Sequence, residues 1–442
     1  MIPSAGSEEL SFWRTKRWWL RAGQTSAGVY VATAIGFVAT LVAARTLGPG
    51  GFGALELAVV TVAAVATLLD FSLEEAVIHH GARALADGDP GGLRSLIRTS
   101  LRIDLAIGVA VFGILLAAAP FAADAVSEGR LAPSLIRLAA LEALIVTVNG
   151  TTGALLVVCG RPHLRAWSSA VANAARLAGV VVAAIAETGA LGMLTGLVAG
   201  SAIGAAVQAV LAWRTGRIAW AGASGGRAHV PAGEVVRFAI HSSVTTTLIA
   251  LRIAAVSVLL GRSLGPAAVG IFAVAMFPVT LAEVASSPLR LLMIPEQATL
   301  AAHGRPDVVW KGIVAYAKWS VVVGLPAAGL GWLVLPRLLP LLYGSSFDAA
   351  IRPARILLVA ALAGLVVAWS KALPAALGRP GVRTTMSLLE LALTAGALAA
   401  LADRGVTGVA VALSAVAVVT ACAWWIVARR MLVPVSGTAE RA

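Results

Sequence analysis

The sequence predicts an all-α polytopic membrane protein with about 12 transmembrane helices in two six-helix lobes. Composition is the first reason: 59% of the 442 residues are hydrophobic, 12% are charged, and the mean hydropathy is +0.90. A soluble globule could not bury so much apolar surface, and apolar stretches long enough to span a bilayer recur along the chain. A repeat of the half-chain and an asymmetry of charge between loops are the other two reasons.

Two motifs occur twice in nearly the same register. Arg45-Thr-Leu-Gly-Pro-Gly-Gly-Phe-Gly53 returns as Arg262-Ser-Leu-Gly-Pro-Ala-Ala-Val-Gly270, and Gly160-Arg-Pro162 returns as Gly378-Arg-Pro380. The displacements, from 45 to 262 and from 160 to 378, are 217 and 218 residues, so one duplication accounts for both motifs. Leu-Gly-Pro-x-x-x-Gly is expected to form a tight outer turn, in which proline starts the next helix and glycine permits close approach. Gly-Arg-Pro is expected to form the equivalent inner turn.

Each span needs about 20 residues to cross about 30 Å of hydrocarbon. The spans of the first half are expected near residues 22–46, 53–78, 99–121, 135–159, 167–187 and 190–212. Those of the second half are expected near residues 237–261, 269–294, 311–335, 353–377, 384–402 and 405–428. The predicted organisation is a cytoplasmic interfacial segment (1–21), an N-terminal lobe (22–213), a cytoplasmic linker (214–236), a C-terminal lobe (237–430) and a cytoplasmic tail (431–442).

Charge asymmetry predicts the orientation. Arginine clusters in the loops assigned to the inner side, for example at Arg94, Arg161 and Arg165, and again after the last span at Arg429 and Arg430. The positive-inside rule then predicts that both termini are cytoplasmic, in a multi-pass protein of the plasma membrane. Because six predicted spans separate the repeats, both lobes enter the membrane in the same direction, and a binding site is expected between them.

Several function classes are disfavoured. The formal net charge is +13, but the basic residues lie in short clusters between apolar spans, so nucleic acid is not an expected partner. No G-x-x-x-x-G-K-[ST] phosphate loop is present, and no outer loop is long enough for a catalytic domain, so we expect no enzyme and no catalytic residues. The two cysteines, Cys159 and Cys422, suggest neither a disulfide framework nor a metal site, and no cofactor is expected.

Polar residues within spans are the candidate site residues, because charge in hydrocarbon is costly and usually faces a cavity or a partner. At about 100° per residue, His241, Thr245 and Arg252 share one face of the span near 237–261. Two interpretations stay open. The face is a cavity wall that offers a cation to a phosphate, or Arg252 pairs with a carboxylate of a neighbouring helix and holds the bundle together.

The next span carries a second stripe. Glu283, Ser287 and Arg290 lie on one face between two prolines that can kink the helix. Glu283 is a candidate for protonation coupled to transport, whereas Arg290 either contacts substrate or snorkels at the cytoplasmic end. Lys371 and Glu390 are interpreted as snorkelling residues near inner helix ends.

The first half contains a carboxylate pair. Asp70 and Glu74 lie one helical turn apart in the span near 53–78. Like charges this close should raise at least one pKa if poorly hydrated, which suits a proton or cation site. The alternative is that the helix end reaches water there, in which case nothing is perturbed.

Two further stripes have structural interpretations. Glu142, Asn149 and Gly153 share a face of the span near 135–159, and Asn149 and Gly153 are interpreted as interhelical contacts. Arg176, on a face with Ser169 and Asn173, either lines a cavity or pairs within its lobe, for example with Glu142.

Short motifs in this order and spacing resemble the polysaccharide flippase family of the multidrug/oligosaccharidyl-lipid/polysaccharide (MOP) exporter superfamily. The resemblance covers about Arg21 to Arg430. It rests on the Leu-Gly-Pro turn after the first span, Asp70-Phe-Ser-Leu73, Gly160-Arg-Pro162, Ile294-Pro-Glu296 and Leu341-Leu-Tyr-Gly344.

The resemblance implies that a lipid-diphosphate-linked oligosaccharide is flipped from the inner to the outer leaflet by alternating access, for cell-surface polysaccharide biosynthesis. The implied partners are the lipid-linked oligosaccharide, membrane lipids, polysaccharide polymerase and glycosyltransferases. The expected substrate-binding residues are Arg252, Arg290, His241, Thr245, Arg21 and Gln24, and the expected ion-coupling or proton-coupling residues are Asp70, Glu74 and Glu283.

One departure from the family puts ion coupling in doubt, because Arg252 stands where many relatives have an acidic residue. Two alternatives remain. A multidrug exporter of the same superfamily should have a more apolar or acidic cavity for organic cations. A membrane glycan polymerase would need a sizeable outer loop, which this sequence lacks.

Overall fold

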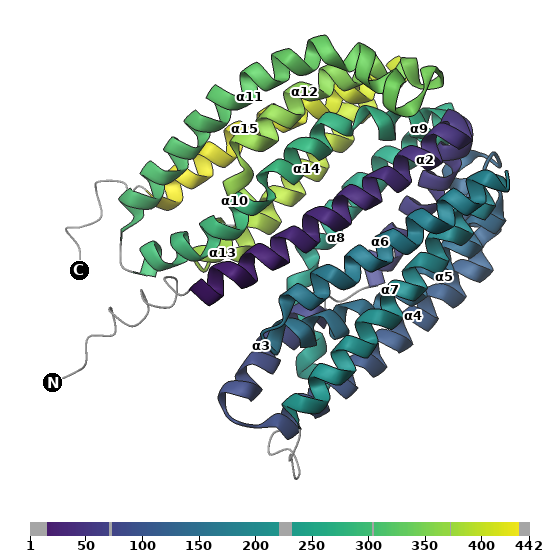
Figure 1. Cartoon of the computed structure of the whole chain (residues 1–442). Coiled ribbons are helices and arrows are strands. Elements are labelled where there is room, and N and C mark those ends of the chain that lie inside the picture. The colour runs from purple at the N-terminus through teal and green to yellow at the C-terminus, as the bar shows by residue number, and fades with distance from the viewer. Residues whose placement is uncertain (1–15, 70–72, 221–231, 303–304, 372, 433–442) are drawn as a thin grey trace. The chain divides into compact units, whose positions relative to one another are not determined.

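The computed structural model describes residues 16–69, 73–220, 232–302, 305–371 and 373–432. Every regular element in these ranges is a helix, as predicted (Figure 1). The first half contains α2 (Lys16–Leu69), α3 (Leu73–Ala86), α4 (Pro90–Ser127), α5 (Pro133–Val158), α6 (Pro162–Ile185) and α7 (Gly189–Ala219). The second half contains α8 (Ala232–Leu264), α9 (Pro266–Ala275), α10 (Phe277–Ala302), α11 (Pro306–Tyr343), η1 (Ser345–Ala350), α12 (Ile351–Val366), η2 (Ala368–Lys371), α13 (Leu373–Ala376), α14 (Pro380–Leu401), η3 (Ala402–Arg404) and α15 (Gly405–Leu432).

The number of spans agrees with the prediction. Ten described helices are long and apolar enough to cross a membrane, or up to 11 if α9 and α10, bent by 43°, form one span. Helix α2 has 54 residues, about 80 Å at 1.5 Å per residue, far more than about 30 Å of hydrocarbon. Its backbone leaves helical geometry at Gly48, just before Pro49. Because α2 therefore holds two spans, the total is about 12.

Several span boundaries differ from those predicted, and proline explains two of them. The span expected near 269–294 breaks at Met276, because Pro278 cannot donate to the carbonyl of Val274 and its ring crowds that turn. The span expected near 353–377 stops at Val366 and continues as η2 and α13; Pro374 cannot donate to the carbonyl of Ser370, so η2 does not continue into α13 as one α-helix. The second predicted span, 53–78, is divided: α2 ends at Leu69 and α3 begins at Leu73.

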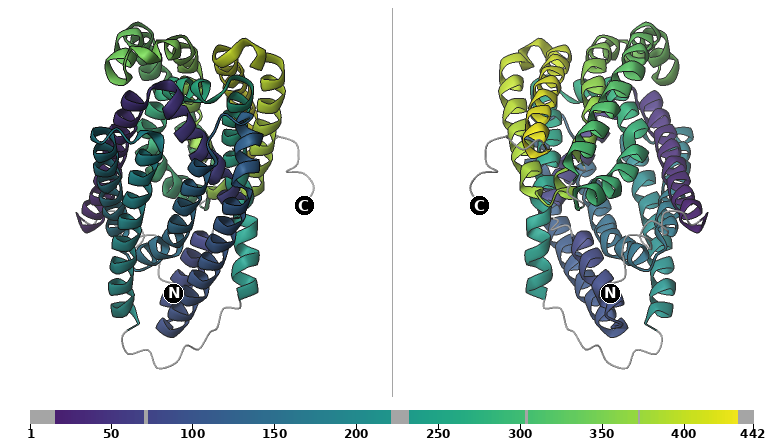
Figure 2. Two further views of the ribbon diagram at one scale, coloured as in Figure 1. Left: turned by 90° about the vertical axis from the view of Figure 1, so that its right-hand side faces the viewer. Right: turned by 90° about the vertical axis from the view of Figure 1, so that its left-hand side faces the viewer.

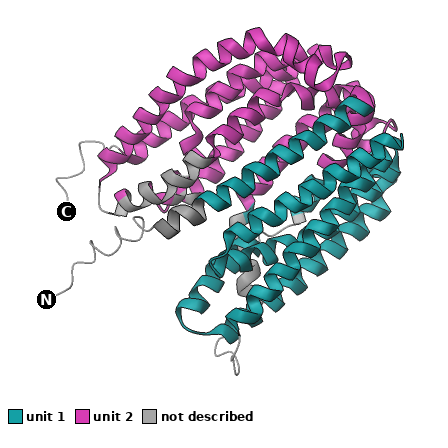
Figure 3. Ribbon diagram, in the orientation of Figure 1, with its two compact units in different colours: residues 1–46, 62–123, 132–243 teal, residues 47–61, 124–131, 244–442 magenta. Residues whose placement is uncertain are grey.

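The chain forms two compact units (Figure 3). Unit 1 comprises residues 1–46, 62–123 and 132–243, and unit 2 comprises residues 47–61, 124–131 and 244–442. In unit 1, α5 and α6 pack on α7; in unit 2, α12 and α14 pack on α15 and α11 packs on α12. Figure 2 shows the chain from two further sides. Unit 2 thus includes two segments that the division by sequence assigns to the N-terminal lobe.

The repeated motifs form the turns expected of them. Gly48 and Gly265 have nearly the same backbone conformation, with φ 64° and ψ −179° at the first and φ 87° and ψ 174° at the second. Such positive φ values favour glycine. The two Gly-Arg-Pro turns are alike, because Gly160 and Gly378 have φ values of 71° and 67° and helices α6 and α14 begin two residues later, at proline.

The last glycine of each Leu-Gly-Pro-x-x-x-Gly motif, Gly53 or Gly270, lies against the other copy of the motif, within unit 2. A Cβ atom added to Gly53 would lie 1.7 Å from the carbonyl oxygen of Pro266, and one added to Gly270 would lie 2.3 Å from the carbonyl oxygen of Pro49. The predicted close approach is therefore a reciprocal contact between the two copies of the motif, and only glycine leaves room for it.

Glycines also allow α6 and α7 to approach closely in unit 1. A Cβ atom on Gly200 would lie 2.3 Å from the backbone nitrogen of Arg176, and one on Gly196 would lie 2.5 Å from the carbonyl carbon of Gly179. Small residues at such crossings bring backbones together and replace the hydrophobic driving force that is missing in lipid.

Gly200→Ala is expected to destabilise the protein by about 1–3 kcal/mol, because α6 must move away from α7. Thermal unfolding of the detergent-solubilised protein measures this. Gly113→Ala in α4 is the matched control, since a Cβ atom there would meet nothing within 4 Å, and alanine is the better helix former by up to about 1 kcal/mol. Equal unfolding temperatures for the two variants would contradict the close crossing.

Candidate functional site

In unit 1, Glu74 is held by an arginine from another helix. Arg165 of α6 donates from Nη1 and Nη2 to the two carboxylate oxygens of Glu74 at 2.5 and 2.9 Å. The guanidinium lies over Gly153 of α5, where a Cβ atom would be 2.9 Å from Arg165 Nε. This paired geometry ties α3, α5 and α6 together. Asp70, the predicted partner of Glu74 in a carboxylate pair, lies outside the described residues.

A second ion pair lies between α5, α6 and α7. Arg176 Nη2 donates to Glu142 Oε1 at 2.6 Å, and Arg176 Nε donates to Ser201 Oγ at 2.8 Å. Ser201 Oγ in turn donates to Glu142 Oε1 at 3.0 Å. The interpretation of Arg176 as the partner of Glu142 within its lobe is confirmed. Each charge of this triad is compensated, as the cost of charge in hydrocarbon requires.

The amide residues of unit 1 make interhelical contacts. Gln208 Nε2 donates to the backbone carbonyl oxygen of Asn149 at 2.8 Å and to Thr152 Oγ1 at 2.9 Å. Asn173 Nδ2 donates to the carbonyl oxygen of Ala32 in α2 at 2.7 Å. Gly153, against Arg165, is an interhelical contact as interpreted, whereas Asn149 makes its contact through the backbone carbonyl and not through its amide side chain.

In unit 2, the predicted stripe on α8 faces α14. Arg252 Nη1 lies 3.4 Å from Glu390 Oε2, and the hydroxyl oxygens of Thr245 and Thr384 are 2.9 Å apart. The side chains of Arg252 and Glu390 are 31% and 22% exposed, so the pair leaves donors of the guanidinium open to further contacts. The interpretation of Arg252 as the partner of a neighbouring carboxylate is confirmed, and a contact with substrate stays a prediction.

Glu283 of α10 also has a basic partner. Its carboxylate pairs with Lys371 Nζ at the end of η2, and Arg383 Nη1 of α14 donates to the Lys371 carbonyl oxygen at 3.3 Å. Lys371 and Glu390, interpreted as snorkelling residues, both form ion pairs within unit 2. The predicted span boundaries placed both residues near helix ends and carried no information about the opposite helix.

These five residues, Arg252, Glu283, Lys371, Arg383 and Glu390, form what we call the C-terminal charged cluster. Counted over the described side chains alone, it contains three basic groups and two carboxylates, a formal surplus of one positive charge. The side chains of Glu283 and Lys371 are 56% and 45% exposed. Charged groups this exposed on helices that cross a membrane need water or a polar ligand beside them. In unit 1, by contrast, the Glu74–Arg165 and Glu142–Arg176 pairs balance.

The remaining predicted residues are only partly described. Gln24 is exposed near the start of α2. The side chains of Arg21, His241 and Arg290 lie outside the described part of the structure, so their predicted contact with substrate stays a prediction.

Several ionisable residues within spans were not predicted as site residues, and three of them are informative. Glu56 lies in α2, Asp104 is 3% exposed in α4, and Lys318 lies on α11. The rule that identified Glu283, namely charge inside an apolar span, would have found all three. Among the described residues, no group of three or more His, Cys, Asp or Glu could hold a metal ion.

The fold is that of known membrane transporters. An inward-facing multidrug resistance MATE family transporter of the MOP superfamily matches with a TM-score of 0.73 at 14% identity, over 89% of this chain and 93% of that one. A mutant MATE transporter of Vibrio cholerae matches with a TM-score of 0.66 at 15% identity, over 94% and 96%. A MOP superfamily transporter of Pyrococcus furiosus matches with a TM-score of 0.65 at 14% identity, over 92% and 94%.

Sequence comparison identifies the family. Comparison with curated proteins gives no match. The family model described as "Polysaccharide biosynthesis protein" matches residues 22–292, more than half of the chain. The chain therefore belongs to the polysaccharide biosynthesis protein family of the MOP superfamily, and it is a multi-pass membrane transporter.

Proposed function

We propose that this transporter flips a lipid-diphosphate-linked oligosaccharide from the inner to the outer leaflet, for cell-surface polysaccharide biosynthesis. The positive surplus of the C-terminal charged cluster carries the proposal. A diphosphate head group cannot cross hydrocarbon without compensating charge. A cluster that keeps one basic group in excess of its carboxylates offers that compensation.

Within the cluster, Arg252 is suited to the diphosphate. Its planar guanidinium can donate paired hydrogen bonds to phosphate oxygens, and its contact with Glu390 is a long 3.4 Å. Glu283 and Lys371 form the second, more exposed pair of the cluster. Glu283 can take up a proton when Lys371 turns to the ligand, which is how coupling to a proton would enter. Thr245 and Thr384 add hydroxyl donors for sugar or phosphate oxygens.

The alternative function, export of several drugs, is supported only by the fold that this chain shares with its structural neighbours. The structural neighbours include multidrug MATE transporters, but at 14% identity this likeness concerns the fold alone. For the Pyrococcus furiosus neighbour, reversed polarity of the binding pocket was taken to suggest a different function. In this chain the described cluster is more basic than acidic, which favours an anionic substrate over an organic cation.

The proposal includes the cellular setting. Arginine-rich inner loops support a plasma-membrane location with both termini in the cytoplasm. The glycosyltransferases that build the glycan on the cytoplasmic side, and a polysaccharide polymerase acting after it is flipped, are then the proposed partners.

We expect the purified protein, reconstituted in vesicles, to expose a fluorescent undecaprenyl-diphosphate oligosaccharide to an impermeant quencher, whereas a neutral glycolipid with the same sugars stays inaccessible. The diphosphate supplies the charge that the basic surplus attracts. Protein-free vesicles and ethidium efflux are the controls. Ethidium export without movement of the glycolipid would support the multidrug alternative. Equal flipping of the neutral glycolipid would contradict recognition of the diphosphate.

A further inference from the structure

Helix α11 carries a lysine that pairs with none of the described residues, on a face that is largely exposed. α11 is the least buried of the candidate spans, and its residues Trp319 and Val322 are 68% and 60% exposed. Lys318 is exposed on this helix. The ion pairs formed by the described residues do not include it. A lysine inside a span without a carboxylate partner needs another source of negative charge.

Tryptophans mark the depth of this lysine. Trp310 packs edge-to-face on Trp425 at 5.6 Å, and farther along α11 Trp332 packs under Arg355 at 4.9 Å. From residue 310 to residue 332 the helix rises about 33 Å, close to the hydrocarbon thickness of about 30 Å. The two tryptophans thus fit the two interfacial belts. Lys318 then lies about 12 Å inside the belt at Trp310.

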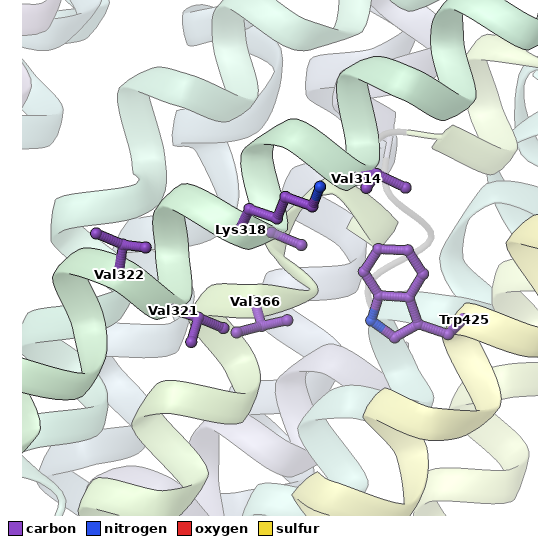
Figure 4. A pocket seen from close by; sticks show the side chains of 7 residues that line it. Val314, Lys318, Val321, Val322, Val366 and Trp425 are labelled. Carbon is purple, nitrogen blue, oxygen red and sulfur yellow. The ribbon is translucent and has the colours of Figure 1, made fainter.

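A groove of about 550 Å³ lies beside Lys318, within unit 2. Its walls are Val321 and Val322 of α11, Val366 at the end of α12 and Trp425 of α15, so they are almost wholly apolar (Figure 4). The Lys318 side chain extends along α11 toward Val314, that is, toward the belt at Trp310. The volume falls in the range of small-molecule sites, and an apolar trough with one cation at its rim matches an acyl chain with an anionic head.

We propose that this groove binds an anionic phospholipid, with one acyl chain along Val321, Val322 and Val366 and the phosphate on the Lys318 ammonium. The apolar walls stabilise the chain, and the phosphate supplies the charge that Lys318 lacks among the described protein groups. The groove holds the chain alongside α11, and the Lys318 stem extends toward the belt at Trp310, which brings its ammonium toward the phosphate at the interface. The site is separate from the C-terminal charged cluster and does not rest on the transport proposal.

Native mass spectrometry of the full-length protein tests this, by titration with phosphatidylglycerol and with phosphatidylcholine of the same acyl chains. Wild type should bind phosphatidylglycerol about fivefold more tightly, and Lys318→Met should abolish that preference. Val322→Trp fills the groove from an exposed position and should weaken both lipids. Arg429→Met, which removes an exposed charge from the last turn of α15, should change neither.

Three results would overturn the site. Lys318→Met could bind phosphatidylglycerol as wild type does, in which case the ammonium holds no phosphate. Arg429→Met could lose as much affinity as Lys318→Met, which would mean general surface attraction. Val322→Trp could bind both lipids normally, which would mean that no chain occupies the groove.

Discussion

Gly53→Ala is expected to destabilise the protein by about 3 kcal/mol or more, at the upper end of the range for overpacking or beyond it. The new Cβ atom would lie 1.7 Å from the carbonyl oxygen of Pro266. Both sides of this contact are backbone atoms, so no side chain can rotate to make room. The two helical segments that begin at Pro49 and at Pro266 must therefore move apart. Gly270→Ala should behave alike, because its Cβ atom would lie 2.3 Å from the Pro49 carbonyl oxygen. Thermal unfolding in detergent, followed by size-exclusion chromatography, measures both.

Gly50→Ala is the matched control, three residues away in the same motif. A Cβ atom there would meet nothing within 4 Å, and the second copy of the motif already has alanine at the equivalent position, Ala267. This variant should unfold at the wild-type temperature or slightly above it. If Gly53→Ala were as stable as Gly50→Ala, the reciprocal contact would not exist as described.

Arg252→Ala is expected to lower the rate of glycolipid flipping by about tenfold to a hundredfold, the usual effect of losing hydrogen bonds to a charged group. The same change leaves Glu390 without its partner and so also destabilises unit 2. Flipping is therefore measured in vesicles and normalised to folded protein. Arg252→Lys should recover only part of the rate, because an ammonium keeps the charge but lacks the planar pair of donors.

The double variant Arg252→Ala/Glu390→Ala separates the two roles of Arg252. Removing both charges should restore stability, because no unpaired charge remains in the span. If Arg252 holds the diphosphate, flipping stays low. Recovery of flipping together with stability would show that Arg252 only holds α8 to α14. Arg429→Ala, an exposed arginine outside the cluster, should leave both properties unchanged.

Much of the fold was accessible from local sequence patterns. The turns at Gly48 and Gly160 were predicted because proline and glycine restrict the backbone locally, whatever the rest of the chain does. The bend at Met276 follows from Pro278 for the same reason. The break before Pro374 follows the same rule, although it was not anticipated, since hydropathy alone continued the span to residue 377.

The candidate site was only partly accessible. Helical phase placed Thr245 and Arg252 on one face, and the structure directs that face toward α14. Phase could not identify Glu390 as the partner of Arg252, or Lys371 as the partner of Glu283. The pairing of Glu142 with Arg176 was anticipated because both are isolated charges in adjacent spans and each needs compensation.

Hydropathy, loop charge and the 217-residue repeat were sufficient for an all-helical membrane protein of two related halves. A bilayer forces every long apolar segment into the same hydrogen-bonded helix, so composition and spacing carry that information. The reciprocal contact of Gly53 with Gly270, the bidentate hold of Arg165 on Glu74 and the pairing of Lys371 with Glu283, 88 residues away, required the folded chain. Such contacts depend on which helix faces meet and at what height, and the periodicity of a single helix says nothing about its neighbours.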